Sequence, residues 1–247
     1  MNEQMLHVLK QEQSIFIDYN ESITIQNFRL FYAPSIKDSQ YYNMAYPLTC
    51  KEEPDNKELK YIKEFYRNKG LEGLIASTNN SYLRDCKYSY HYMKLEKKIT
   101  KIEDVQIKIT CKKYMNDNEL DAFCNIMKNA FSFSDELTEY FHDRLQILSK
   151  NHESNHWLVF DRDSLIACSS TFRTNDGGDF LFNVAVTPEY RKKSIGLQLI
   201  KYISQYSNSP LYVFTPNSIM KNRILPSIGF SSIGDLLVVP LSHLSEK

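Results

Sequence analysis

Three consecutive cations followed by small residues form the stretch of this sequence best suited to chemistry. Arg191, Lys192 and Lys193 precede Ser194, and Gly196 comes two positions later. They fall where a helix is expected to start, and the first backbone N–H groups of a helix have no partner within it. Cations are unfavourable beside that positive helix end unless an anion lies there as well. The residues therefore predict an anion site of about the size of a phosphate.

An apolar strand and an amphipathic helix must hold this site in place. The run Phe180–Val186 is rich in aromatic and β-branched residues, which is typical of a strand buried on both faces, and Thr187 and Pro188 end it. A helix is expected to begin close to Arg191 and to continue to Tyr206. Its buried stripe is predicted at Ile195, Leu199, Tyr202 or Ile203, and Tyr206.

The overall charge excludes some classes of partner. The chain has 247 residues with 30 basic and 30 acidic side chains, so its net charge is zero. A nucleic-acid-binding protein usually carries a surplus of Lys and Arg, so we expect no nucleic-acid partner. No apolar run approaches the roughly 20 residues that cross a bilayer, and Met1–Lys10 does not resemble a secretory signal. We therefore expect a cytoplasmic protein without a membrane partner.

The cysteines indicate free thiols. Their number is odd, and they are widely scattered with no Cys-x-x-Cys pair, which argues against a disulfide framework and against a metal site. We expect all of them to be structural. They are Cys50, Cys86, Cys111, Cys124 and Cys168.

The first hundred residues are predicted to form a smaller α/β domain, residues 1–100. A short helix is expected at Met1–Lys10, and Pro54 and Gly70 bracket a longer helix over Asp55–Lys69. Strands are expected at Ser22–Ala33, Tyr41–Pro47, Leu71–Ser77 and Tyr88–Leu95. The charged run Glu96–Asp104 is typical of a solvated connector, so a domain boundary is placed there.

The remaining chain, residues 105–247, is predicted to form a second α/β domain with a mixed sheet and helices on its faces. Its expected order is β-α-α-β-β-β-α-β-α-β. The elements are a strand at Val105–Lys113, helices from Asn116 or Asp117 to Phe131 and over Asp135–Lys150, strands at Trp157–Phe160, Leu165–Phe172 and Phe180–Val186, the helix ending at Tyr206, a strand at Leu211–Thr215, a short helix at Ser218–Leu225 and closing strands within Ser231–Leu241.

A short internal repeat suggests a duplication. Leu74–Ser81, LIASTNNS, matches Leu211–Ser218, LYVFTPNS, at the Leu, Thr, Asn and Ser positions. A long helix is expected before each segment and a short helical segment after each. The first domain is therefore interpreted as a degenerate copy of part of the second.

The stretch from Val186 to Ile200 resembles the acetyl-CoA signature of the GNAT superfamily of N-acetyltransferases, Arg/Gln-x-x-Gly-x-Gly/Ala after a strand. Arg191 and Gly196 match this pattern, whereas Ser194 replaces its middle glycine. Asn217 and the later Ile228-Gly229-Phe230 resemble a second marker of the family. The resemblance covers about Val105–Leu241 and implies the GNAT fold, with acetyl-CoA as co-substrate.

The resemblance also implies a set of cofactor-binding residues. Backbone groups of Val184, Ala185 and Val186 would pair with the pantetheine arm like an added strand. Backbone N–H groups from Arg191 to Gly196 would hold the pyrophosphate. The set that it implies is Val184, Ala185, Val186, Arg191, Lys192, Lys193, Ser194, Ile195, Gly196 and Asn217.

The usual acid and base of the family are not found at their expected positions. Leu225 occupies the place where many members have a tyrosine acid, and Phe182 and Asn183 stand where a carboxylate base is common. Asn183 can orient a water but cannot accept a proton. Asn183, Tyr190 and Tyr212 remain the catalytic candidates of the sequence. His156 and His243 are also considered, although a packed or surface histidine is the more frequent explanation.

Two functions stay open at this level. The first is transfer of an acetyl group from acetyl-CoA to an amine by direct attack in a ternary complex. The second is a non-catalytic acyl-CoA-binding or partner-binding module, which the missing acid and base favour. A general nucleotide binder ranks last, since the chain has no Walker or GxGxxG pattern. The acceptor pocket is expected to involve the two helices between Asn116 and Lys150, the closing strands and the N-terminal half, and the sequence does not identify the small-molecule or peptide amine.

Overall fold

The structure is a computed structural model that describes residues 1–37, 42–50, 53–82, 84–99, 108–151, 153–208, 210–216 and 224–245. The chain forms two compact units. Unit 1 comprises Met1–Met93, Phe214–Asn222 and Ser232–Lys247, and unit 2 comprises Lys94–Val213 and Arg223–Ser231. A single boundary near residue 100 does not separate these units, because the last strand of the chain packs in unit 1. The division into domains 1–100 and 105–247 stays a prediction.

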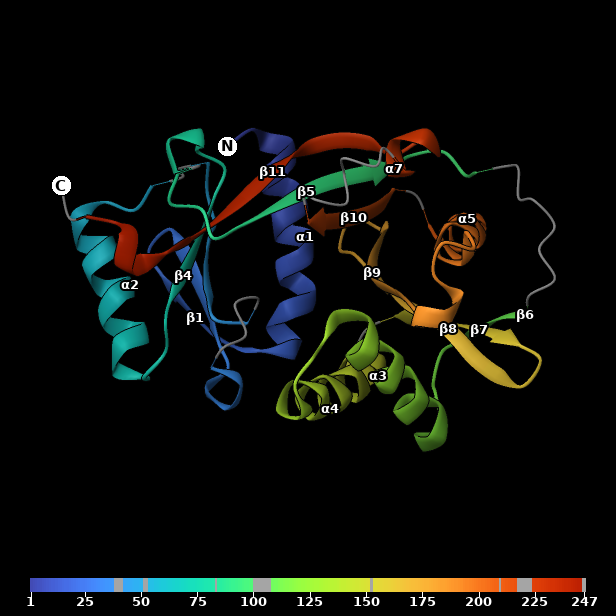
Figure 1. Cartoon of the computed structure of the whole chain (residues 1–247). Coiled ribbons are helices and arrows are strands. Elements are labelled where there is room, and N and C mark those ends of the chain that lie inside the picture. The colour runs from blue at the N-terminus through green and yellow to red at the C-terminus, as the bar shows by residue number, and fades with distance from the viewer. Residues whose placement is uncertain are drawn as a thin grey trace. The chain divides into compact units, whose positions relative to one another are not determined.

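Unit 1 is an α/β unit whose strands lie in the order β1-β2-β3-β4-β11-β5 (Figure 1). The sheet is mixed, since β3 and β4 are parallel whereas β11 is antiparallel to β4. Its elements are α1 (Glu3–Tyr19), β1 (Glu21–Ile25), β2 (Phe28–Tyr32), η1 (Pro34–Ile36), β3 (Met44–Pro47), α2 (Asn56–Asn68), β4 (Leu74–Ser77), η2 (Asn80–Tyr82), β5 (Tyr88–Leu95), β11 (Ser231–Pro240) and η4 (Leu241–His243).

The core of unit 1 lies between α2 and the sheet. Ile62 and Tyr66 of α2 are fully buried against Phe28, Leu30 and Val239 of the strands. The predicted α2 is confirmed, and the side chain of Asp55 caps its N-terminus. The first helix, α1, is longer than the ten residues expected, because its apolar contacts continue through Ile15 and Phe16.

Unit 2 has the strand order β10-β9-β8-β7-β6. The pair β9 and β10 is parallel, and the other neighbouring pairs are antiparallel, so the predicted mixed sheet is confirmed. Its elements are β6 (Lys108–Lys112), α3 (Asp117–Phe131), α4 (Asp135–Asn151), β7 (Ser154–Asp161), β8 (Ser164–Arg173), β9 (Asp179–Val186), η3 (Pro188–Tyr190), α5 (Ile195–Tyr206), β10 (Leu211–Pro216, whose last residues belong to unit 1) and α7 (Ile224–Ser227).

Helices cover both faces of the unit 2 strands (Figure 1). On one face Phe123 of α3 packs edge-on against His156 of β7. On the opposite face Tyr202 of α5 packs against Trp157, the next residue of the same strand. Because successive strand side chains point to opposite faces, α3 and α5 lie on different sides of the sheet. The body of α5 is thereby separated from α3 by the strand layer.

The predicted start of α5 was wrong by four residues. The helix begins at Ile195 rather than near Arg191, because Arg191 is extended and Lys192 and Ser194 have positive φ angles of 63° and 59°. Its buried apolar residues are Ile195, Leu199, Ile200 and Ile203. The assignment of Tyr206 to the buried stripe was also wrong, since Tyr206 is 61% exposed. The short helix predicted at 218–225 falls mainly outside the described residues.

The two units share one topological motif. In unit 1 the parallel strands β3 and β4 are joined through α2, and in unit 2 the parallel strands β9 and β10 are joined through α5. The sequence repeat begins in β4 and β10, the last strand of each motif. A repeat seen both in sequence and in strand direction supports the interpretation of unit 1 as a degenerate copy.

Candidate functional site

The turn before α5 has the backbone shape of an anion site. Lys192 and Ser194 both adopt left-handed conformations within four consecutive turn residues that lead directly into the helix. When left-handed residues alternate with residues of other conformation, successive N–H groups point toward one side and create a concavity that binds anions. A left-handed conformation is costly for a residue with a Cβ, so the surrounding structure must impose it here.

The first turn of α5 is also left open. Ser194 stands at the N-cap, but its side chain makes no capping hydrogen bond. By contrast, Asp55 with Glu58 and Asn116 with Glu119 close the starts of α2 and α3 through reciprocal capping boxes. Within the described part of the chain, no side chain competes for the first N–H groups of α5. An anionic ligand can therefore receive them.

Two of the three cations are engaged in shaping the turn. The Arg191 guanidinium donates from Nε to the carbonyl oxygen of Val186 at 3.3 Å and from Nη2 to that of Ala130 at 3.4 Å. The Lys193 ammonium lies 4.7 Å from the ring centroid of Tyr190. No partner of Lys192 is seen among the described residues, so its ammonium is the one available to an incoming anion.

Tyr190 anchors the turn to the β7–β8 hairpin. Its hydroxyl donates to Oδ2 of Asp161, the last residue of β7, and this hydrogen bond raises the pKa of Tyr190. The tyrosine is thereby fixed as a neutral donor. This role differs from that of a catalytic acid, for which Tyr190 was a candidate from the sequence.

Strand β9 changes direction at Asn183. This residue has a φ of 50°, and the register with β8 shifts opposite it, between Cys168 and Ser170. Pairing of β9 with β10 joins Asp179 to Leu211 and Phe180 to Tyr212, and no further pair follows among the described residues of the two strands. A bulge of this kind bends the bulged strand. No described residue therefore pairs with the backbone edge of residues 182–186 that faces away from β8.

Gly196 lies over this open segment. A Cβ at Gly196 would meet the side chains of Val186 and Val184 at 3.5 and 3.6 Å, which is ordinary van der Waals contact. The glycine is therefore not required for packing against β9. Together, residues 184–186 and 191–196 form one continuous backbone surface, so the structure brings together the predicted cofactor-binding residues that it describes. Asn217 lies outside the described residues.

The other catalytic candidates lie in different surroundings. The hydroxyl of Tyr212 donates to Oδ2 of Asp176 at 2.6 Å, and burial, followed by this hydrogen bond, raises the pKa of Tyr212. Tyr212 pairs with Phe180, before β9 separates from β10. Asn183 is half-buried at the bulge itself and is the one candidate located where the strands separate.

The two histidines considered from the sequence are not placed for catalysis. His156 is fully buried, bridges the hydroxyls of Ser149 and Ser170 at 2.7 and 2.8 Å, and has its pKa lowered by burial to about 4. It is a neutral structural histidine. His243 is exposed in η4 of unit 1. Leu225, at the position of the usual tyrosine acid, is buried and apolar.

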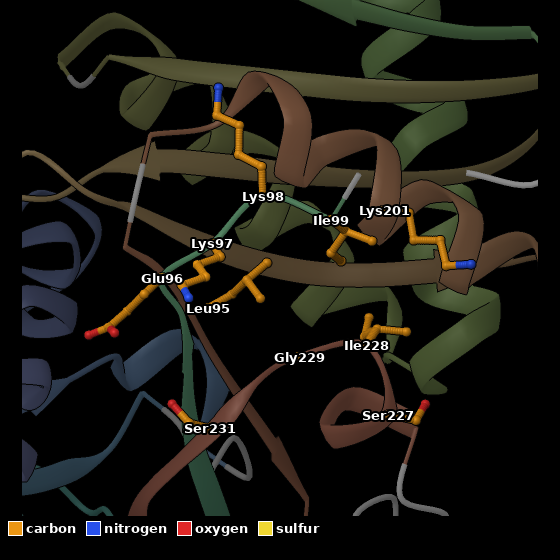
Figure 2. A pocket seen from close by; sticks show the side chains of 10 residues that line it. All are labelled: Leu95, Glu96, Lys97, Lys98, Ile99, Lys201, Ser227, Ile228, Gly229 and Ser231. Carbon is orange, nitrogen blue, oxygen red and sulfur yellow. The ribbon is translucent and has the colours of Figure 1, made fainter. Parts of the chain in front are cut away.

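A separate pocket of unit 2 has a volume of about 690 Å³ (Figure 2). It is lined by residues 95–99, by Lys201 of α5 and by the turn that contains Ser227 and Gly229. Figure 2 shows the ammonium groups of Lys98 and Lys201 pointing away from each other. Lys98 donates to the carbonyl oxygen of Gln205 at 2.8 Å. The pocket does not include the turn at 191–196, and its cations do not converge on one point.

The corresponding helix start in unit 1 is unsuited to an anion. Glu58 accepts from the backbone N–H of Asp55 at 2.9 Å and from the amide of Asn27 at 2.7 Å. Asp55 in turn accepts from the N–H of Glu58. Carboxylates thus occupy the positive end of α2. Of the two related motifs, only that of unit 2 has an open helix start among the described residues.

Sequence reasoning missed three features of the site. These are the left-handed backbone of Lys192, the attachment of Tyr190 to Asp161 and the two carbonyl contacts of Arg191. Asp161 follows the strand predicted at Trp157–Phe160 and precedes the one predicted at Leu165–Phe172, and no sequence signal links it to Tyr190. The described residues hold no group of three His, Cys, Asp or Glu side chains suited to a metal ion. No described helix is long and apolar enough to cross a bilayer.

Comparison with known proteins agrees with this geometry. Residues 120–218 match the acetyltransferase (GNAT) family. A GCN5-related N-acetyltransferase from Kribbella flavida has a similar fold, with a TM-score of 0.68 and 10% identity over 95% of this chain and 94% of that chain. A functionally unknown conserved protein from Staphylococcus epidermidis gives a TM-score of 0.67 and 10% identity over 92% and 96% of the two chains.

A tandem GNAT protein from the clavulanic acid biosynthesis pathway is similar as well, with a TM-score of 0.55 and 9% identity over 82% of this chain and 76% of that chain. No curated protein matches the chain in sequence. At these identities the structural likeness establishes the fold, and the family match adds the kind of activity. Residues 120–218 therefore form a GNAT acetyltransferase domain, and the protein is an acyltransferase.

Proposed function

We propose that the protein transfers the acetyl group of acetyl-CoA to an amine by direct attack within a ternary complex. One observation carries this proposal: the left-handed turn of Lys192 and Ser194 opens the start of α5 directly beside the unpaired edge of β9. An anion-binding turn next to an open strand edge suits a ligand that combines a pyrophosphate with an amide-containing arm.

The residues present fit such a ligand. The N–H groups at the start of α5, with the ammonium of Lys192, would receive the pyrophosphate. The open backbone of Val184–Val186 would pair with the amides of the arm as an additional strand. Gly196 places no side chain between these two elements. When bound, acetyl-CoA supplies the thioester carbonyl that an amine attacks.

Asn183 is proposed to handle the proton of the amine through water. Its side chain lies at the bulge, and no partner for it is seen among the described residues. An amide can orient a water molecule but has no basic group of its own. An amine that arrives neutral needs little more than this positioning. Asn183→Ala should therefore lower kcat and leave the Kd for CoA unchanged.

Thermal unfolding with acetyl-CoA tests the cofactor assignment. Acetyl-CoA at 100 times its dissociation constant should stabilise the protein by about 2.7 kcal/mol. Desulfo-CoA and adenosine serve as controls for the pyrophosphate and nucleoside parts of the ligand. If neither acetyl-CoA nor CoA changes the melting temperature, the cofactor assignment is wrong.

Turnover distinguishes an enzyme from a binding module. An amine-dependent release of CoA thiol, measured over polyamines, aminoglycosides, amino acids, arylalkylamines and peptide N-termini, would support acetyl transfer. Binding of acetyl-CoA without turnover on any of these amines would favour the acyl-CoA-binding module. The hydroxyls of Tyr190 and Tyr212 each donate to an aspartate, so neither tyrosine favours the enzyme over the binding module, and turnover is the measurement that separates the two.

A further inference from the structure

A series of neighbouring aromatic rings runs through the α3 and α4 side of unit 2. Phe131 and Phe133 are stacked with their centroids 5.7 Å apart, and Phe133 lies 6.0 Å from Phe141. Phe141 is in turn stacked on Phe182 at 6.2 Å, with an interplanar angle of 10°. The outer ring, Phe131, is 44% exposed, whereas Phe141 and Phe182 are buried. The rings thus connect the surface with strand β9.

The inner end of this series lies beside Asn183, which is proposed above to handle the proton of the amine. Phe182 directly precedes Asn183, where β9 bends and its pairing with β10 has ended. The ring of Phe182 faces the α3 and α4 side of the sheet, as its contacts with Phe141 and Phe172 show. A ligand arm that follows the edge of β9 from α5 would bring its acyl end to the aromatic side.

The outer rings are held in place by the backbone of the α3–α4 linker. Ser132 ends α3 in a left-handed conformation, and its N–H and that of Phe133 both donate to the carbonyl oxygen of Lys128. Arg191 contacts the carbonyl oxygen of Ala130, the residue before Phe131. The linker is therefore fixed to the same turn that shapes the anion site.

Two carboxylates next to the linker already have partners. Asp135 pairs with Lys128 across the linker, which lowers the pKa of this carboxyl. Glu136 interacts with its own backbone N–H and with Ser134 at the start of α4, and these hydrogen bonds lower its pKa. A polyamine or aminoglycoside needs carboxylates to pair with its several charges. The aromatic rings instead offer stacking area for an uncharged body.

From this arrangement we propose that Phe131 and Phe133 form the acceptor subsite and that the acceptor is a primary amine carried on an aromatic group. The inference rests on the acetyl transfer proposed above. The amine nitrogen forms a bond to the acetyl carbonyl carbon, and the carbon–sulfur bond of acetyl-CoA breaks. The proton lost by the nitrogen reaches the departing CoA thiolate through water.

Acceptor preference is tested by the kcat/KM for thiol release with tryptamine and phenethylamine against spermidine and kanamycin. The proposal expects kcat/KM to be at least about tenfold higher for the two arylalkylamines, because stacking on two rings adds to the burial of apolar area. 2-Cyclohexylethylamine, which has similar bulk without a π-system, should fall between the two groups.

The variant Phe131→Ala tests how much the Phe131 ring contributes to acceptor binding. It should lower kcat/KM for tryptamine about tenfold, mainly through KM, while the melting temperature and the Kd for CoA stay unchanged, because the side chain is half exposed. Phe131→Leu should recover part of the loss. Tyr114→Ala, which removes another exposed ring of unit 2, 69% exposed, should have no effect.

The outcomes separate this inference from the proposed function. If acetyl-CoA binds and spermidine or kanamycin is the better acceptor, or if Phe131→Ala leaves tryptamine kinetics unchanged, the aromatic subsite is wrong and acetyl transfer stands. If no amine turns over, equilibrium dialysis of tryptamine with the CoA-bound protein decides: binding that Phe131→Ala abolishes supports the subsite, and absence of binding overturns it. Failure to bind acetyl-CoA at all contradicts the proposed function itself.

Discussion

The ammonium of Lys193 lies over the ring of Tyr190, 4.7 Å from its centroid, and the hydroxyl of the same tyrosine donates to Asp161. One residue of the anion-binding turn is thus held by a cation on its face and by a carboxylate at its edge. The neighbouring Lys192 is left available. The turn is therefore built from contacts within the protein, and its shape does not depend on the anion.

Removal of the Tyr190 hydroxyl should weaken CoA binding more than it weakens the fold. Tyr190→Phe loses the hydrogen bond to Asp161 but keeps the ring under Lys193, so we expect the Kd for CoA to rise about fivefold, as for the loss of one ordinary hydrogen bond. Isothermal titration calorimetry measures this change. Tyr190→Ala, which also removes the ring, should raise the Kd further, and equal Kd values for both variants would contradict the anchoring role.

Lys192 should contribute more to CoA affinity than Lys193. Lys192→Gln is expected to raise the Kd for CoA about threefold, in the range of a solvent-exposed ion pair, and to reduce its dependence on NaCl. Lys193→Gln should have a smaller effect, because its ammonium is engaged with Tyr190. Lys201→Gln, on the same helix but at the separate pocket, is the control. A larger effect of Lys193 than of Lys192 would show that the turn rearranges on binding.

Ser194→Gly should stabilise the protein although glycine is more flexible than serine in the unfolded chain. The left-handed conformation of Ser194 strains a side chain with a Cβ, and glycine relieves about 1 kcal/mol of this strain. Urea unfolding should therefore show a higher midpoint. Ser164→Gly, at the exposed start of β8 where φ is not positive, should lower it instead. A lower midpoint for Ser194→Gly would mean that the strain is relieved in another way.

His156 should make stability fall with decreasing pH. Burial lowers its pKa from 6.5 to about 4, so the unfolded chain binds a proton between these values that the folded protein does not. The contribution of His156 is therefore complete above about pH 6.5 and is lost as the pH falls to about 4, on the order of 3 kcal/mol in total.

Urea unfolding from pH 7.5 to 4.5 measures this loss. His156→Gln can keep hydrogen bonds to Ser149 and Ser170 without titrating, so its profile should be flatter over this interval. His142→Gln, at a histidine that is paired with Asp121 near the surface, should retain the slope of the parent protein. If the stability of His156→Gln falls with pH as steeply as that of the parent protein, other groups cause the loss of stability.

Most elements of unit 2 could be predicted because they depend on local patterns. The Asn116 cap and the apolar spacing that follows it fixed α3, and the β-branched run at 180–186 fixed β9. The start of α5 could not be predicted, because Lys192 and Ser194 adopt left-handed conformations that their residue types do not favour. Contacts of Arg191 with Ala130 and of Tyr190 with Asp161 accompany that geometry, and both partners are remote in sequence.

The sequence by itself determined that a cation-rich turn lies between a buried strand and an amphipathic helix, because cations, small residues and apolar spacing are local signals. From these signals the turn was predicted to bind an anion. The sequence also established the resemblance of this stretch to the GNAT signature. Only the tertiary structure decided which cation stays available, which tyrosines are engaged and which rings reach strand β9. These relations join residues such as Phe131 and Phe182 that are distant in the chain, and packing of α3 and α4 against the sheet sets their distances.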